Sequence, residues 1–196
     1  MIRTVEAKDL RMIAAIHKEN FGDHFLGKFS KGLIAEFYSC FLGDENFIAS
    51  FDDDGECQGF VLGGDSQLIA NQGNDFIKGN FLRYAVEILF RPNTWGGAIN
   101  RLVPFIKRLK KKKYSRVNKE TKSSYSLLSI AVSKKFQRQG IATELVSAFE
   151  RICTCDCYYL SVHSNNVKAI SFYKKIGMKE VPSNNKSIRF RKDLYK

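Results

Sequence analysis

The sequence predicts an α/β (α+β) fold in which a mixed sheet is flanked by helices. Three observations indicate this class. Short apolar runs bounded by polar residues, such as 127–132, have the length of buried strands. Segments with apolar residues at helical spacing, such as 142–149, alternate with these runs. The turn sequence at 52–55 joins two apolar runs into a hairpin, so part of the sheet is antiparallel.

The first elements predicted are a strand at 2–6 and two helices. Asp9 is a good N-cap for a first helix that fades near residues 21–22. A second helix fits 31–42, where the apolar residues form one stripe and Gly43 follows as the stop. Strands at 46–51 and 57–62 form the hairpin.

Residues 66–122 have the least regular pattern and are predicted to form a basic helical insertion. Helical spacing at 76–90 is broken at 91–93 and resumes at 98–113.

Two strand–helix units follow the insertion. The first lies within 125–152, and the second has a strand at 158–162 and a helix at 166–176 that Gly177 closes. A last strand is expected at 187–194. No repeat or linker divides the chain, so 1–196 is predicted to be a single domain.

Composition points to a cytoplasmic protein. The sequence has no signal peptide pattern and no run of about 18 or more apolar residues. The five cysteines are odd in number and lack an export signal, so free thiols are expected. The spacing of Cys153, Cys155 and Cys157 matches no common zinc pattern, so no metal site is predicted.

The positive charge is concentrated in one segment. The chain has a net charge of +12, and residues 101–122 hold ten Lys or Arg against one acid, Glu120, which leaves only +3 for the rest. The segment is therefore treated as a local basic patch on a nearly neutral domain.

The turn between the strand and helix of the first unit has the features of an anion seat. A helix N-terminus presents unpaired N–H groups and a partial positive charge. Gly140 lets the backbone approach a ligand, and Ala142 keeps the next turn slim. Gln137, Arg138 and Gln139 can place donors around an anion. The alternative is a tight strand–helix connection, and the turn is neither a Walker loop nor a dinucleotide fingerprint.

Two motifs stand in a fixed order in the second half of the chain. The first is Gln137-Arg-Gln-Gly140-Ile-Ala142. The second has Asn166, Ala169 three residues later, Tyr173 seven residues later, and then Gly177-Met178. Together they resemble the GCN5-related N-acetyltransferase (GNAT) superfamily of acyl-CoA-dependent enzymes, which more often has Phe at the position of Met178. The resemblance is firm over 125–181, extends more weakly to 1–62, and says nothing about 66–122.

The resemblance implies a GNAT-type, mostly antiparallel mixed sheet and acetyl-CoA as co-substrate. The pyrophosphate would lie on the N–H groups of residues 138–143, including Ile141 and Thr143. The pantetheine arm would pair with the main chain of Ile130 and Val132, on a strand that in this family splays from its neighbour, often through a bulge. A backbone N–H near Val132 would stabilise the thioester oxygen as it gains charge.

Five residues are candidates for catalysis and binding. In the family, a tyrosine at the position of Tyr173 protonates the leaving thiolate, and the alternative is a core aromatic residue. Asn166 lies two turns earlier on the same helix face and is expected to cap the helix and to contact the pantetheine. His163 ends a strand and is a candidate general base, since imidazole commonly has that role, although a structural role is the alternative. Asp23 and His24 lie in the loop that borders the acceptor site in this family and are rival candidates.

Three interpretations of residues 76–122 remain open. The first is a helical insertion with a solvated basic face. The second is peripheral contact of 101–122 with an anionic membrane, through interleaved basic and apolar residues. The third is a site for an anionic acceptor such as a nucleotide-linked sugar. No aromatic platform or known motif accompanies the lysines, which disfavours nucleic acid.

The function expected from these observations is acetyl-CoA-dependent N-acetylation of a primary amine in a small acceptor. The layout is similar to an acetyltransferase subgroup of cell-surface polysaccharide synthesis, which suggests an amino sugar and a location at the inner membrane surface. The alternatives are a protein amine as acceptor, or a non-catalytic acyl-CoA-binding sensor or scaffold. A homo-oligomer is compatible with the sequence.

Overall fold

The computed structural model describes residues 1–80, 83, 86–87, 124–183 and 187–194. Within these ranges the strands form one seven-stranded sheet in the order β1-β2-β3-β4-β5-β7-β6. Neighbouring strands pair antiparallel, except that β4 and β5 are parallel. The predicted mixed, mostly antiparallel sheet is therefore confirmed.

Apart from β6, the described strands and helices follow the predicted order. The strands are β1 (Ile2–Thr4), β2 (Phe47–Phe51), β3 (Cys57–Asp65), β4 (Tyr125–Val132), β5 (Cys157–His163), β6 (Lys179–Val181) and β7 (Ser187–Asp193). The α-helices are α1 (Leu10–Phe21), α2 (Lys31–Ser39), α3 (Ser66–Gly79), α6 (Ile141–Ile152) and α7 (Val167–Lys175). Short 3-10 helices are η1 (Ala7–Asp9), η2 (Leu26–Lys28) and η4 (Lys134–Phe136).

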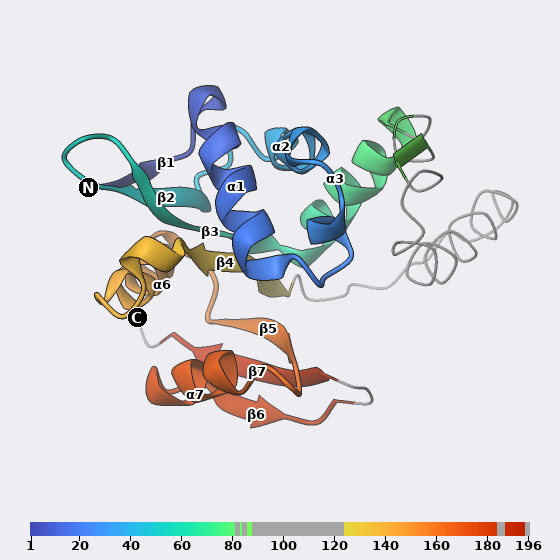
Figure 1. Ribbon diagram of the computed structural model, residues 1–196. Helices are drawn as coiled ribbons and strands as arrows, with labels where there is room; N and C mark the ends of the chain where they lie inside the picture. Colours follow the sequence, from blue (N-terminus) through green and yellow to red (C-terminus); the bar gives the residue numbers. More distant parts are fainter. Residues whose placement is uncertain (81–82, 84–85, 88–123, 184–186, 195–196) are drawn as a thin grey trace, which may run out of the picture.

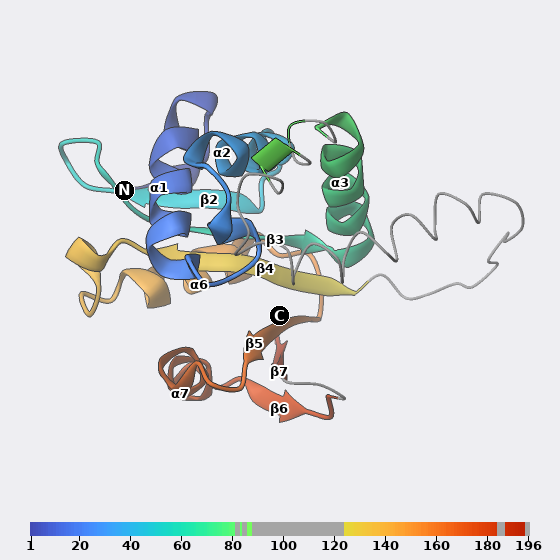
Figure 2. The ribbon, with the colours of Figure 1, turned by 45° about the vertical axis from the view of Figure 1, so that its right-hand side comes forward.

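Helices cover both faces of the sheet. Figures 1 and 2 show α1 and α2 on one face of β2–β4 and α6 on the other, with α7 against β5 and β7. Each layer has its own core. Phe47 and Phe60 pack under α1 and α2, whereas Ile48 and Val61 on the same two strands pack with α6. Alternation along β2 and β3 thus buries side chains on both faces of the sheet, as the continuous apolar runs predict.

The first helix begins as predicted but not for the predicted reason. The carboxylate of Asp9 makes no capping hydrogen bond to α1. It instead accepts two hydrogen bonds from Arg3, at 2.7 and 3.0 Å, and one from the Glu6 N–H at 2.9 Å. Asp9 therefore stands at the predicted N-cap position, but its side chain does not cap α1 because the Arg3 guanidinium binds the carboxylate.

Other element boundaries differ from the sequence-based expectation. α2 ends at Ser39, earlier than the predicted residue 42, although Gly43 has the positive φ of 87° expected of a stop. The helix predicted to start at Phe76 instead starts at Ser66, the first residue of the predicted insertion, as α3. β6 was not predicted, because a three-residue edge strand leaves no period to detect. The predicted helix at 98–113 and the basic patch lie outside the described residues.

Candidate active site

The site is organised by the parting of the two parallel strands. β4 and β5 pair only at their first residues, and the last pair joins Ser126 to Tyr159. Both strands continue well beyond this pair, β4 to Val132 and β5 to His163, and Figure 1 shows them diverging. The expected splay is therefore confirmed. Past Ser126, the edge of β4 is left for a ligand to pair with, as an added strand would.

A bulge in β4 accompanies the splay. Leu62 faces Ser129 while Gly63 faces Leu127, so Leu128 is an extra residue in β4. The bulge changes the face on which later side chains lie. Leu127 packs with the α6 cluster, whereas Ala131 packs under α1 and α2.

The backbone polar groups of Ile130 and Val132 point away from β3. In an antiparallel pair, successive residues direct their N–H and C=O groups to alternate sides. Ser133 N–H donates to the Gln58 carbonyl at 2.9 Å, so the groups of residue 133 face β3 and those of Val132 face the other way. The same alternation applies to Ile130. Both residues thus present backbone groups on the side that β5 has left.

The turn from β4 into α6 forms a concave row of N–H groups. Arg138 has a φ of 66° and Gly140 a φ of 89°, while Gln139 between them is not in the positive region. Alternation of this kind directs successive N–H groups to one side and makes an anion-binding concavity. Among the described residues, the N–H groups from 138 to 142 have no hydrogen-bond partner, whereas the Thr143 N–H donates to the Gly140 carbonyl at 2.8 Å.

The other side chains of this turn leave its outer side open. A Cβ added at Gly140 would meet no atom within 4 Å. Ile141 is buried in the α6 cluster, so only its backbone can contact a ligand. Ala142 is half-buried and Thr143 is exposed. The amide of Gln139 donates a long hydrogen bond of 3.4 Å to the Lys135 carbonyl.

Gln137 has a structural role that the sequence did not predict. Its side-chain amide donates to the Asn20 side chain at 3.2 Å and to the Val132 carbonyl at 3.1 Å. Asn20, at the end of α1, also donates to the Val132 carbonyl at 3.1 Å. These bonds join α1, the end of β4 and the turn. The donors of Gln137 are therefore directed back to β4 and not outward to an anion.

Asn166 and Tyr173 lie on α7 as the motif implies. The Asn166 side chain accepts a hydrogen bond from the Ala169 N–H at 3.1 Å, which confirms the N-cap. Tyr173 is buried against Phe172 and Phe190, with 8% of its surface exposed. Its hydroxyl makes no hydrogen bond to any described residue. Burial raises the pKa of Tyr173 to about 12, so the phenol keeps its proton at neutral pH.

The structure brings two of the candidate histidines together from distant segments. The rings of His24, in the loop between α1 and α2, and His163, at the end of β5, lie edge to face with centroids 5.0 Å apart. The loop that carries Asp23 and His24 is tied to α1, because Lys18 donates to the carbonyls of Gly27 and Phe29 at 3.0 and 2.6 Å. The loop and the end of β5 therefore face one another on the side of the sheet covered by α1.

His17, the third histidine, continues this group and was missed by sequence reasoning. Its Nδ1 is 2.8 Å from the hydroxyl of Tyr38, which donates to Ser129 of β4 at 3.1 Å. Phe21 packs between His17 and His24, with ring centroids 4.8 and 5.3 Å away. Burial lowers the pKa of His17 to about 4, and the charges of His24 and Lys18 act in the same direction.

Among the described residues there is no group of three or more potential metal ligands. All five cysteines are free thiols, as predicted, and burial raises the pKa of Cys57 to about 12. Within the same ranges, no helix combines the length and the apolar composition needed to cross a bilayer.

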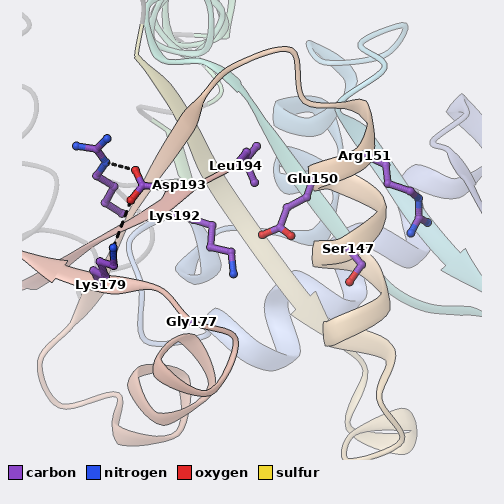
Figure 3. A pocket seen from close by; sticks show the side chains of 9 residues that line it. Ser147, Glu150, Arg151, Gly177, Lys179, Lys192, Asp193 and Leu194 are labelled. Carbon is purple, nitrogen blue, oxygen red and sulfur yellow. Dashed lines mark hydrogen bonds and ion pairs between the residues drawn. The ribbon is translucent and has the colours of Figure 1, made fainter. Parts of the chain in front are cut away.

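A separate cavity of about 500 Å³ lies between the second half of α6 and the end of β7 (Figure 3). None of the candidate residues lines it. Of the α6 residues that line the cavity, Ser147 is the nearest to Gly140. It lies seven positions further along the chain, which is about 10 Å along the helix axis. Of the cations that line it, Arg191 and Lys179 pair with Asp193 and Lys192 donates to the Ile176 carbonyl, whereas Arg151 is exposed. The candidate residues therefore lie along the splayed strands and the turn before α6, and not around this cavity.

Comparison with known proteins gives the class. Residues 11–178 match the acetyltransferase (GNAT) family. The chain belongs to this family, and enzymes of the family use acetyl-CoA.

Individual relatives are distant. Over 59 residues, the chain is 39% identical to an N-alpha-acetyltransferase of Sulfurisphaera tokodaii, a match that covers 28% of this chain and 35% of that protein. The fold is similar to an N-acetyltransferase from Staphylococcus aureus Mu50, with a TM-score of 0.65, 15% identity and coverage of 97% and 98% of the two chains. It is also similar to the PaiA N-acetyltransferase of Thermoplasma acidophilum in complex with coenzyme A, with a TM-score of 0.53, 16% identity and coverage of 98% of both chains.

Proposed function

We propose that this protein is an acetyl-CoA-dependent N-acetyltransferase that transfers an acetyl group directly to a primary amine. The observation that carries the proposal is the parting of β4 from β5, with the row of free N–H groups at one end and Tyr173 among the residues of the α6 and α7 core. The residues fit the coenzyme: a concave set of donors for its pyrophosphate, and a free strand edge for its pantetheine arm.

Each candidate residue has a task in this proposal. The backbone N–H groups of 138–142 hold the pyrophosphate, whereas that of Thr143 already donates to the Gly140 carbonyl, and Ile130 and Val132 pair with the arm. A free N–H of β4 stabilises the negative charge that develops on the thioester oxygen. Tyr173, whose phenol is protonated at neutral pH, donates its proton to the sulfur that leaves.

The acceptor side uses the other face of the sheet. His163 accepts the proton that the amine loses, and Asp23 and His24 contact the acceptor from the loop opposite. Asn166 orients α7 and contacts the arm. Holding both substrates together makes the transfer intramolecular in effect, so no nucleophilic cysteine is needed.

Two classes of acceptor are retained. The similarity to an N-alpha-acetyltransferase favours a protein amine. The second class is a small amine, including an amino sugar of cell-surface polysaccharide synthesis. The nine net positive charges of 101–122 support contact of the protein with an anionic membrane surface.

A panel of amines incubated with acetyl-CoA tests the function. We expect release of free thiol with at least one amine and loss of that release in the His163→Gln variant. Tight acetyl-CoA binding without transfer to any peptide, amino sugar or polyamine would establish the non-catalytic sensor instead. Binding to anionic but not neutral vesicles, lost when Lys110 to Lys113 are neutralised, tests the membrane contact.

A further inference from the structure

One face of the β5–β7–β6 part of the sheet has no described helix over it. α7 packs on the opposite face, where Leu160, Val162 and Phe190 are buried (Figures 1 and 2). The alternate residues of the same strands are half-buried or exposed. We call these residues the open face: Cys157, Tyr159, Ser161, His163, Lys179, Val181, Ser187, Arg189, Arg191 and Asp193.

The open face begins at the candidate acceptor site. His163, its first residue, contacts His24. From there the register runs in cross-strand pairs, with His163 opposite Ser187, Ser161 opposite Arg189 and Tyr159 opposite Arg191. Lys179 of β6 lies beyond, opposite Arg191. The face is thus continuous with the histidine pair, Arg189 is the first cation along it, and Asp193 lies at its far end beside Arg191.

The side chain of Arg189 is restrained and keeps its N–H donors available for an anion. Its guanidinium carbon lies 4.4 Å from the centroid of the Tyr159 ring, a cation–π contact that restricts the side chain. Arg189 has no ion pair with any described residue, whereas Arg191 and Lys179 share Asp193, at 2.7 and 3.6 Å. The stacked guanidinium keeps its N–H donors available in a planar fork that suits a carboxylate.

The spacing indicates the length of the acceptor. At about 3.3 Å per residue, Ser161 lies about 7 Å and Tyr159 about 13 Å from His163 along β5. The guanidinium of Arg189 lies between Ser161, its partner, and Tyr159, the ring beneath it. An acceptor that places its amine at the histidines and an anionic group at Arg189 must therefore be extended by about 10 Å, which is two to three residues of peptide.

We propose that the acetyl acceptor is an extended chain with a carboxylate two or three residues from its reactive amine, and that Arg189 on the open face binds this carboxylate. The inference rests on the proposed acetyltransferase function. It assigns the specificity to the described strand β7, separately from the basic segment 101–122.

Matched peptides test the inference. Each pair has a free N-terminal amine and differs only by Glu or Gln at position two or three. We expect the wild-type protein to acetylate the Glu peptide with a KM about 5-fold lower, a difference that added salt reduces. Arg189→Gln should raise the KM for the Glu peptide to that of the Gln peptide and leave kcat and the Gln peptide unchanged. Arg151→Gln, which removes one exposed charge from α6, is the matched control and should keep the preference.

Each other outcome has a defined meaning. Equal KM values for the two wild-type substrates, or a preference that survives in Arg189→Gln, overturn the inference and leave the acetyltransferase function standing. Arg189-dependent use of a phosphorylated amino sugar in place of the peptides overturns the extended acceptor. If no amine is acetylated, the proposed function fails. Calorimetry of the same peptides with coenzyme A present then tests whether Arg189 binds the carboxylate. If the Glu and Gln peptides show no difference in affinity that depends on Arg189, the inference fails too.

Discussion

At the residue scale, the hydroxyl of Tyr173 distinguishes a chemical role from a packing role. The ring is a core element, but the oxygen makes no hydrogen bond to the described residues and so contributes little to the fold. A buried phenol without a structural partner is available for a reaction. Removing this one oxygen atom therefore tests the chemical role of Tyr173 without removing its ring from the core.

Tyr173→Phe should keep the fold and the affinity for acetyl-CoA while turnover falls about 100-fold, the scale of general acid catalysis. The measurement is steady-state kinetics on whichever amine the panel identifies, with calorimetry for the coenzyme. Tyr158→Phe is a useful comparison, because that hydroxyl already donates to Glu150 at 2.8 Å. Full turnover in Tyr173→Phe, with chemistry rate-limiting, would mean that Tyr173 is only a packing residue.

His17 gives a second prediction, on stability and pH. Its pKa is about 4 in the folded protein and about 6.5 when exposed, so the unfolded state binds the extra proton first as the pH falls. The contribution is fully present above pH 6.5 and is lost between 6.5 and 4. We expect this residue alone to cost up to about 3 kcal/mol of stability over that window.

Urea unfolding at pH 7 and pH 4.5 measures this loss. His17→Phe should reduce the difference in the free energy of unfolding between the two pH values. An equal pH dependence in wild type and His17→Phe would contradict the assignment of the titrating group to His17.

At the scale of elements, the turn before α6 joins backbone conformation to charge. Gly140 needs a positive φ of 89°, yet a side chain there would meet open space. Asn and Asp have the same shape, and both tolerate this conformation better than other residues do. Comparing Gly140→Asp with Gly140→Asn therefore separates the effect of charge at the helix N-terminus from the effect of backbone geometry.

Gly140→Asp should weaken acetyl-CoA binding at least about 10-fold more than Gly140→Asn, because its carboxylate repels the pyrophosphate. Calorimetry of both folded variants measures the difference. Similar affinities for the two would indicate that no phosphate lies at this turn.

The motif residues were predictable from sequence because their roles are local. Asn166 caps the helix that it begins, and Gly140 supplies the φ of the turn that it occupies. Asn20 and His17 were not predictable, since their partners, Val132 and Tyr38, are 112 and 21 residues away. The sequence places both on α1 but does not show which face of α1 meets β4.

At the scale of the whole molecule, the two halves of the sheet are joined by few strand pairs. β1 to β4 and β5 to β7 meet directly only at the start of β4, and α6 bridges them through a core that contains Leu145, Phe149 and Tyr158. A ligand that pairs with the free edge of β4 would fill the space where the halves part. Its binding should therefore change backbone protection along β4 in an alternating pattern.

Residue-resolved hydrogen exchange tests this pattern. Without ligand, the amides of Ile130 and Val132 should exchange fast, because they face the side that β5 has left, whereas Ala131, opposite Phe60 of β3, should already be protected. Acetyl-CoA at about 100 times its Kd should slow exchange at residues 130 and 132 by up to about 100-fold. Ala131 is the internal control for a general stabilisation of the fold. Equal slowing at all three amides would place the ligand elsewhere, and unchanged exchange at 130 and 132 with bound acetyl-CoA would show that the pantetheine arm does not pair with β4.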